Sequence, residues 1–205
     1  EHGQPNVRRT IADTLSAFVE QNPGRGILFF TEFLPQGANA QDAVAYANLG
    51  LYKGHATVWN VVHKAGIALI GLEPRFVHRN RLLQTRYDAV PGGESSECSI
   101  WLSLEGMRVR NQAWVKLIKK YRTKYPNALF VIHCGEAHAD YLEPFAVPLS
   151  FPAGKTFVSA VYTPVAGNQF EQLLPHPFTK IPALKWGARR YGRATGYDLR
   201  VFVPR

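Results

Sequence analysis

The segment ILFFTE, from Ile27 to Glu32, decides the fold of this 205-residue sequence. A run of apolar and β-branched residues is typical of a strand buried on both faces, and Glu32 puts a carboxylate where this strand is expected to end. The pattern returns in Ile67 to Leu72, followed by Glu73, and in Ala128 to Cys134. Helical spacing separates these segments, which predicts an α/β protein with parallel strands joined by right-handed crossovers.

Apolar residues at helical spacing predict the connecting helices. The first helix has Asn6 as its expected cap and Pro23-Gly24 as its stop. Its apolar face consists of Val7, Ile11, Leu15, Phe18 and Val19. Further helices are expected over Ala40 to Leu51, over Ala56 to Gly66, and from about Glu105 onward. The stretch from Pro74 to Cys98 lacks this pattern, and we expect such a long excursion to be functional or mobile.

The last third of the chain follows a different pattern. A short helical piece is expected near Asp140 to Phe145, and strands are expected over Thr156 to Thr163 and Asp198 to Val203. A proline-containing stretch, Leu173 to Pro182, lies between these strands. We therefore predict a central mixed, mostly parallel sheet flanked by helices, with an antiparallel or edge portion in the C-terminal third. Residues 1–205 are expected to form one catalytic-type domain of a larger protein.

Composition narrows the classes of function. No apolar stretch approaches the ~20 residues of a membrane span, and no leader precedes the first helix, so we expect a soluble chain. Cys98 and Cys134 are too few for a disulfide framework, which favours a reducing environment. The net charge of +9 raises the question of nucleic acid. The basic residues of the helix after Glu105 are interpreted as a face exposed to solvent. A second basic cluster, Lys185 to Arg200, lacks a nucleic-acid-binding signature. We therefore do not expect the protein to bind nucleic acid.

Four polar residues are expected to meet at one edge of the sheet. Glu32, Glu73 and His138 lie at or just past the ends of the expected strands, and His2 precedes a helix as a residue leaving an upstream strand would. Open α/β sheets bind ligands at this edge. Two histidines and a carboxylate suit hydrolysis, because the carboxylate can deprotonate water and an imidazole can protonate a leaving group. The same groups could also hold a divalent metal such as iron or zinc.

Each residue also has a purely structural interpretation. A histidine after a strand is often a cap or core residue, and Glu73 is either a second carboxylate of the site or a strand-end surface residue. Cys134 next to His133 could form a nucleophilic pair, but its position in a buried strand favours inert packing. Surface, cap or loop positions are expected for His55, His63, His78 and His176, and core positions for Trp59, Trp101 and Trp114.

The order of these features resembles the Tiki, TraB, ChaN and erythromycin-esterase superfamily, whose diagnostic pieces are two GxxH motifs with a Glu between them. Glu1-His2-Gly3 matches the end of the first motif, Thr31-Glu32-Phe33 the central Glu, and Gly135-Glu136-Ala137-His138 the complete second motif. Arg108 to Asn111, with Trp114, resembles the Arg-containing helix of the superfamily. The similarity covers roughly the first two-thirds of the chain, and the Gly that opens the first motif is absent from the sequence.

The resemblance implies several activities. Tiki proteins are proteases that use a divalent metal, erythromycin esterases hydrolyse a lactone, and ChaN-like proteins bind haem. A further branch consists of Ras-cleaving endopeptidase domains of large bacterial toxins. A basic, cysteine-poor chain favours a peptidase that a bacterium secretes as a toxin or effector and that acts on a host protein in the cytosol, with a small GTPase as one candidate substrate. A haem-binding protein, an esterase and a catalytically idle binding module that uses the basic C-terminal segment are the alternatives.

The resemblance also implies roles for individual residues. Glu32 would be the base that activates water, His138 the proton donor or oxyanion partner, and His2 its counterpart across the scissile bond. Glu1 would belong to the same catalytic group, and Arg110 would be an electrostatic or structural partner. Asn111 is expected to be structural. The sequence neither requires nor excludes a divalent metal, and if one is bound its expected ligands are His2, Glu32 and His138.

Overall fold

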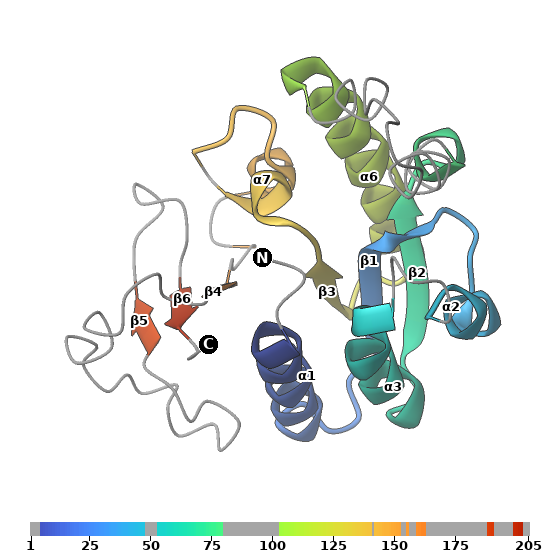
Figure 1. Cartoon of the computed structure of the whole chain (residues 1–205), viewed down its shortest axis with the longest axis vertical. Helices are drawn as coiled ribbons and strands as arrows, with labels where there is room; N and C mark the ends of the chain where they lie inside the picture. Colours follow the sequence, from blue (N-terminus) through green and yellow to red (C-terminus); the bar gives the residue numbers. More distant parts are fainter. Residues whose placement is uncertain are drawn as a thin grey trace, which may run out of the picture.

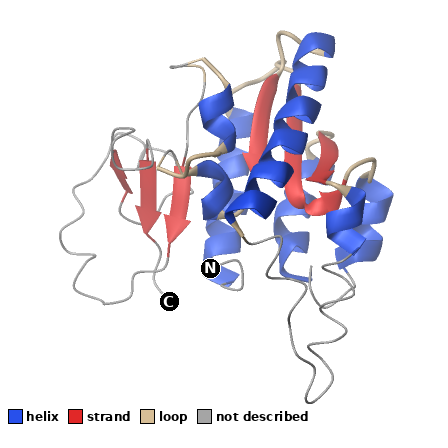
Figure 2. Cartoon of the chain, turned by 90° about the horizontal axis from the view of Figure 1, so that it is seen from above, coloured by secondary structure: helices blue, strands red, loops and turns tan. Residues whose placement is uncertain are grey.

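The computed structural model describes residues 5–47, 53–79, 103–140, 142–152, 155, 159–162, 188–190 and 199–202. Its centre is a three-stranded parallel sheet of order β2-β1-β3. The strands are β1 (Ile27–Pro35), β2 (Ala68–Glu73) and β3 (Leu129–His133). Helices cover both sides of these strands, as Figure 2 shows. The expected α/β class, with parallel strands flanked by helices, is therefore confirmed.

Each face of the sheet has its own helices and its own apolar core. On one face α1 (Pro5–Glu20) and α3 (Ala56–Lys64) pack side by side (Figure 1). The core on that face contains Ala12, Leu15, Phe29, Val58, Trp59 and Val62. The other face is covered by α6 (Leu104–Lys124). The core under α6 contains Leu28, Phe30, Ile70, Leu72, Trp114 and Ile118.

The alternation of side chains along β1 decides where its carboxylate points. Leu28 and Phe30 pack toward α6, whereas Phe29 packs toward α1 and α3. Successive residues of a strand point to opposite faces, so Glu32 shares the α6 face with Leu28 and Phe30. All nine residues of β1 are buried. The strand therefore delivers a buried carboxylate to the side of the sheet on which α6 lies.

The expected end of the first strand is wrong. β1 does not stop before Glu32 but continues to Pro35, because Phe33 and Leu34 extend the apolar run. A register irregularity interrupts its pairing with β2 between Thr31 and Pro35. Within this irregular part, the neighbouring residues Phe33 and Leu34 both pack into the core under α1 and α3. Such a bulge turns a strand locally, and Glu32 lies inside the irregular part.

Other expected boundaries also shift. Helix α1 already begins at Pro5, so Asn6 lies in its first turn and is not the residue before it. Helix α2 (Ala40–Ala47) begins after Asn39, whose side-chain oxygen accepts from the backbone N–H groups of Gln41 and Asp42, and residues 48–52 lie outside the described part. Residues 75–79 are helical, and the rest of the excursion, 80–98, is outside the described residues.

The region after β3 differs most from expectation. A helical turn is expected at Asp140 to Phe145, but the helix lies earlier in the chain, as α7 (Glu136–Ala139). It forms there because the His138 N–H donates to the Gly135 carbonyl. Short 3-10 helices, η1 (Lys53–His55) and η2 (Val147–Ser150), complete this part of the fold. None of the helices in the described ranges is both long and apolar enough to cross a membrane.

A second three-stranded sheet forms in the C-terminal third, at the left of Figure 1. It contains β4 (Ser159–Tyr162), β5 (Ala188–Arg190) and β6 (Leu199–Phe202) in the order β4-β6-β5. β4 and β6 are parallel, whereas β5 and β6 are antiparallel. The expected antiparallel portion is therefore present, and it belongs to this second sheet. The proline-containing stretch Leu173 to Pro182 lies outside the described residues.

The contact between β1 and β2 requires a glycine at position 71. A Cβ on Gly71 would lie 2.0 Å from the carbonyl oxygen of Pro35, which belongs to the backbone and cannot rotate away. We expect Gly71→Ala to lower the free energy of unfolding by about 2 to 3 kcal/mol, since overpacking forces the backbone to shift. Urea denaturation followed by circular dichroism measures this change.

Gly54→Ala is the matched control for this substitution. A Cβ at Gly54 would meet the guanidinium of Arg8, the far end of a flexible side chain that can move aside. We expect the unfolding free energy of this variant to stay within about 0.5 kcal/mol of the wild type. Equal stability of the two variants would show that the approach of Pro35 to Gly71 does not constrain the sheet.

Candidate active site

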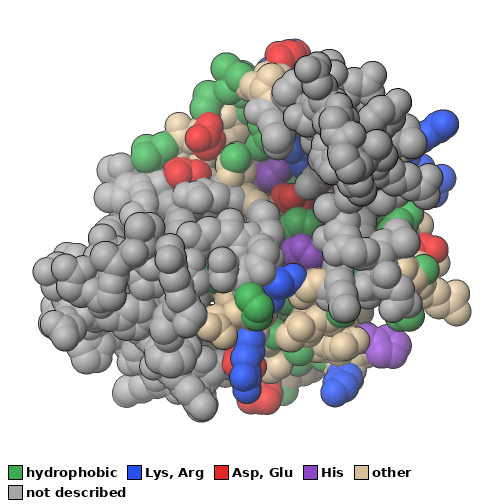
Figure 3. Space-filling model, in the orientation of Figure 1, with side chains coloured by type: hydrophobic (Ala, Val, Ile, Leu, Met, Phe, Trp, Pro, Cys, Tyr) green, Lys and Arg blue, Asp and Glu red, His purple; other side chains and the backbone are tan. Residues whose placement is uncertain are grey.

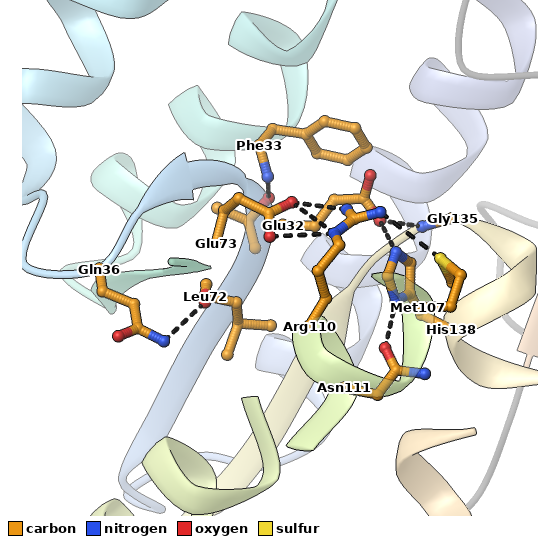
Figure 4. Close-up of polar contacts among 11 residues, drawn as sticks. Glu32, Phe33, Gln36, Leu72, Glu73, Met107, Arg110, Asn111, Gly135 and His138 are labelled. Atoms are coloured by element: carbon orange, nitrogen blue, oxygen red, sulfur yellow. Dashed lines mark hydrogen bonds and ion pairs between the residues drawn. The ribbon is translucent and has the colours of Figure 1, made fainter. Parts of the chain in front are cut away.

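The carboxylate of Glu32 is held by the second GxxH motif. The backbone N–H of Gly135 donates to Glu32 Oε2 at 2.7 Å, and the Nε2 atom of His138 lies 3.5 Å from the same oxygen. The His138 N–H in turn donates to the Gly135 carbonyl at 3.1 Å, which closes a single turn. Because the two residues are three positions apart on this turn, both approach one carboxylate oxygen (Figure 4). The spacing of the motif therefore has a direct structural reason.

The ring of His138 is fixed from two further directions. Its Nδ1 atom makes a short contact with Oδ1 of Asn111. Its ring stacks on Trp114, with centroids 4.0 Å apart and planes inclined by 25°. The Asn111 amide nitrogen donates to the carbonyl oxygen of Phe145 at 2.9 Å. His138 is only 3% exposed, so these contacts replace water around most of its ring.

A buried ion pair lies next to this histidine. Arg110 Nη2 is 2.5 Å from Glu73 Oε2, and Arg110 Nε is 3.1 and 3.2 Å from the two carboxylate oxygens. Arg110 and Glu73 are 2% and 0% exposed. The guanidinium also lies 5.7 Å from the ring centroid of Trp114, and its Nη1 contacts Met107 Sδ at 3.5 Å. Fork geometry of this kind is the strongest arrangement for pairing a guanidinium with a carboxylate.

Helix α6 supplies most of these partners because of its periodicity. Arg110, Asn111 and Trp114 are one, three and four positions apart, which puts them on neighbouring parts of one helix face. Ser103 caps the helix by accepting from the Gly106 N–H at 3.1 Å, which fixes its start. The side chains that orient His138 and pair with Glu73 are therefore mounted on one rigid element.

The structure brings some of the expected site residues together. Glu32 and His138 are in contact, and Arg110 lies beside them in its pair with Glu73. The interpretation of Glu73 as a strand-end surface residue is wrong, because its carboxylate is fully buried. Glu1 and His2 lie outside the described residues. Figure 3 shows histidine, acidic and hydrophobic side chains next to one another in the middle of one face of the molecule.

The sequence did not reveal two contacts near this edge. Asn111, for which the sequence predicts a structural role, contacts the ring of His138. His55 is the N-cap residue of α3, one of its expected positions, but it is buried rather than at the surface and stacks on Phe33 with ring centroids 3.7 Å apart. The ring of His133 lies 5.5 Å from that of His55 on the same face of the sheet. The contact between Asn111 and His138 could have been inferred from the sequence only through the helical spacing between Asn111 and Trp114.

The remaining histidines and tryptophans follow the expectations in part. His78 is buried and packs edge-on against Tyr46 with centroids 5.0 Å apart, so its expected surface, cap or loop position is wrong. His63 is exposed, as expected. Trp59 and Trp114 are buried core residues, which agrees with the sequence. Cys98, Trp101 and His176 lie outside the described residues.

Cys134 follows His133 at the end of β3 and is a free thiol. Burial of the thiol, together with the negative charge of nearby Glu32, raises the pKa of Cys134 well above its usual range, and the positive charge of Arg110 offsets only part of this effect. The thiol therefore stays protonated at neutral pH. Because the thiolate is the reactive form, this environment favours inert packing over nucleophilic catalysis.

The described residues supply only part of a metal site. Glu32 and His138 have the oxygen and nitrogen donors that a divalent ion such as zinc prefers, and they lie together. No group of three or more His, Cys, Asp or Glu side chains able to hold a metal ion occurs among the residues that the structure describes. The third expected ligand, His2, lies outside them.

Comparisons with known proteins identify a similar fold but no family. The sequence matches no protein-family model and no curated protein. The structure is similar to that of the type III effector HopBA1, with a TM-score of 0.58 and 13% sequence identity. The superposition covers 100% of this chain and 84% of the effector chain. At this level of identity the likeness concerns the fold alone, and the superfamily resemblance drawn from the motifs stays a prediction.

We expect native Cys134 to react with iodoacetamide at neutral pH at least about ten times more slowly than the same residue in urea-unfolded protein, because its raised pKa keeps the thiol protonated. Peptide mapping by mass spectrometry separates its modification from that of Cys98. Rapid alkylation of native Cys134 at neutral pH would contradict the inert assignment.

We expect Arg110→Met to lower the free energy of unfolding by about 3 to 5 kcal/mol, because it leaves the Glu73 carboxylate buried without its partner. The added substitution Glu73→Gln should recover part of this loss. Arg108→Met is the matched control, two positions along α6, because the ion pair between Arg108 and Glu105 is exposed to solvent. Urea denaturation of all four proteins gives the comparison, and similar midpoints for the two arginine variants would rule out a structural role of the buried pair.

Proposed function

We propose that this chain is the hydrolase domain of an effector protein and that it cleaves an amide bond in a host protein. The observation that carries the proposal is the buried contact between Glu32 Oε2 and His138 Nε2, 3.5 Å apart, at the edge of a parallel sheet. A carboxylate and an imidazole at this separation can pass one proton between them. Buried, oriented polar groups near the carboxyl ends of the strands of an α/β sheet are typical of active sites.

The proposed reaction needs both groups in turn. Glu32 takes a proton from water while the water oxygen forms a bond to the carbonyl carbon of the substrate. His138 delivers the proton on its Nε2 to the leaving nitrogen as the carbon–nitrogen bond breaks, and the proton on Glu32 then passes to Nε2. The products are a carboxylic acid and an amine, and the site returns to its starting protonation. An amine is a poor leaving group unless it is protonated, so a proton donor next to the base supports peptidase over esterase activity.

The other expected residues have supporting roles in this proposal. Arg110, paired with Glu73, keeps the second carboxylate of the edge neutralised, so that Glu32 is the carboxylate left to act as the base. His2 is proposed as the counterpart of His138 across the scissile bond, and Glu1 as its acidic neighbour. These last two assignments rest on the resemblance of the motifs alone.

The proposal of an effector role draws on the fold. The similar structure is that of a type III effector, and the similarity extends over the whole of this chain. A net charge of +9 favours association with an acidic protein surface. Among host proteins a small GTPase is the candidate implied by the resemblance to the Ras-cleaving toxin domains. The haem-binding alternative is less favoured, because Nε2 of His138 faces a carboxylate rather than an apolar groove.

We expect Glu32→Gln to lower turnover by a factor of about 100 or more, since it keeps the shape of the side chain and removes the base. Cleavage-site profiling of a host-cell lysate by mass spectrometry identifies the substrate and then measures the loss. Parallel reactions with a chelator, and with zinc or manganese restored, test whether activity needs a divalent ion.

Glu105→Gln is the matched control, because it removes an exposed carboxylate on α6 that has no contact with the site. This variant should cleave the same peptides at the wild-type rate. Wild-type cleavage by Glu32→Gln would remove Glu32 from the mechanism, and a lysate without any new termini would reject the peptidase proposal.

A further inference from the structure

We propose that Asn111 is a positioning residue, which holds His138 with a proton on Nδ1 so that Nε2 is the ring atom facing Glu32. The catalytic meaning of this inference rests on the proposed function. The protonation state of the ring can be measured without any substrate, so the inference and the proposed function can fail separately.

The orientation of the Asn111 amide is set by a backbone group. The carbonyl oxygen of Phe145 can only accept a hydrogen bond, and it lies 2.9 Å from the side-chain nitrogen of Asn111. Rotating the amide by half a turn would bring two oxygens together at this position. The amide nitrogen therefore faces Phe145, and the amide oxygen must face the other way. The nitrogen and oxygen of an amide are distinguished by their hydrogen-bonding partners, and the Phe145 carbonyl identifies the nitrogen of Asn111.

The amide oxygen then determines the proton on His138. Oδ1 of Asn111 contacts Nδ1 of the ring, and an amide oxygen is only an acceptor. Nδ1 must therefore carry a hydrogen and donate it. Neutral histidine in water prefers its proton on Nε2, so the contact with Asn111 holds the less common tautomer. In this tautomer the lone pair of Nε2 is the one available for proton exchange.

Trp114 keeps the ring from turning about its Cβ–Cγ bond. The indole stacks on the imidazole at 4.0 Å, and the ring is buried. Asn111 and Trp114 are three positions apart on α6, so one helix face provides both the hydrogen-bond acceptor and the stacking surface. A half-turn of the ring would remove the Nδ1 contact and place a carbon atom toward Asn111. Second partners of this kind commonly fix the tautomer of a functional histidine.

The arrangement has a consequence for Glu32. A neutral Nε2 and an ionised carboxylate are both acceptors, and they would repel one another at 3.5 Å. The contact between Glu32 and His138 is therefore favourable only when the two groups share one proton, bound either to Nε2 or to Oε2. This is the resting state that a proton relay from water to a leaving group requires. Asn111 contributes by keeping the Nδ1 proton out of that exchange.

Nitrogen-15 NMR of the intact chain tests the inference, because protonated and unprotonated ring nitrogens have different chemical shifts. The signals of His138 are assigned from their loss in His138→Gln, and exposed His63 serves as an internal reference. We expect Nδ1 of His138 to be protonated over the whole pH range in which the protein is folded. An unprotonated Nδ1 in wild-type His138 would overturn the inference.

Two variants separate positioning from simple packing. Asn111→Leu keeps the size of the side chain and removes the acceptor, so the neutral ring should move its proton to Nε2 and turnover should fall by a factor of about 100. Asn111→Asp restores an acceptor for Nδ1 but loses the hydrogen bond to the Phe145 carbonyl, so it should restore the Nδ1 proton and only part of the turnover. A folded Asn111→Leu protein that keeps the wild-type ring shifts, or an Asn111→Asp protein that loses the Nδ1 proton, would refute the role. Absence of hydrolysis by the wild type would reject only the proposed function.

Discussion

The carboxylate of Glu32 lies inside a strand whose residues are all buried. A buried charge is stable only where the protein replaces the hydrogen bonds that water would supply. Gly135 supplies a hydrogen bond and His138 an ion-pair contact from one turn of chain, and their spacing of three residues lets both reach the same oxygen. Most of the polar structure at this edge of the sheet follows from this requirement. Because the partners of Glu32 come from the motif after β3, pairing of β1 with β3 is what assembles the site.

Helix α6 connects that pair to the rest of the fold. It gives Arg110 to the carboxylate of Glu73 and gives Asn111 and Trp114 to the ring of His138. A helix is a rigid support, so these contacts hold the ring more closely than a loop would. The same buried polar network makes the edge sensitive to substitution, since loss of one partner leaves another buried group uncompensated. Stability and the proposed chemistry therefore depend on the same side chains.

The two faces of the sheet differ at this edge because successive residues of β1 point to opposite faces. On the α6 face a carboxylate meets an imidazole, whereas on the opposite face the rings of Phe33, His55 and His133 pack against one another. The irregularity between Thr31 and Pro35 ends the simple alternation of side chains and returns Leu34 to the core that already contains Phe33. The polar edge is thereby closed on one side by aromatic packing. The likeness to a type III effector concerns this whole architecture and leaves the chemistry to the side chains.

The sequence by itself determined the α/β class and the three strands of the first sheet, because apolar runs of strand length are local properties of the chain. It predicted that Glu32 and the second GxxH motif meet at one edge of the sheet, but their contact spans 103 positions and forms only through the pairing of β1 with β3. It misplaced the end of β1, since a bulge depends on the neighbouring strand. It also left open whether Glu73 is buried, which only the approach of Arg110 from α6 decides. The contact of Asn111 with His138 joins residues 27 positions apart. Such contacts depend on how a helix docks on a sheet, and that docking is set by the packing of the whole core rather than by any one segment.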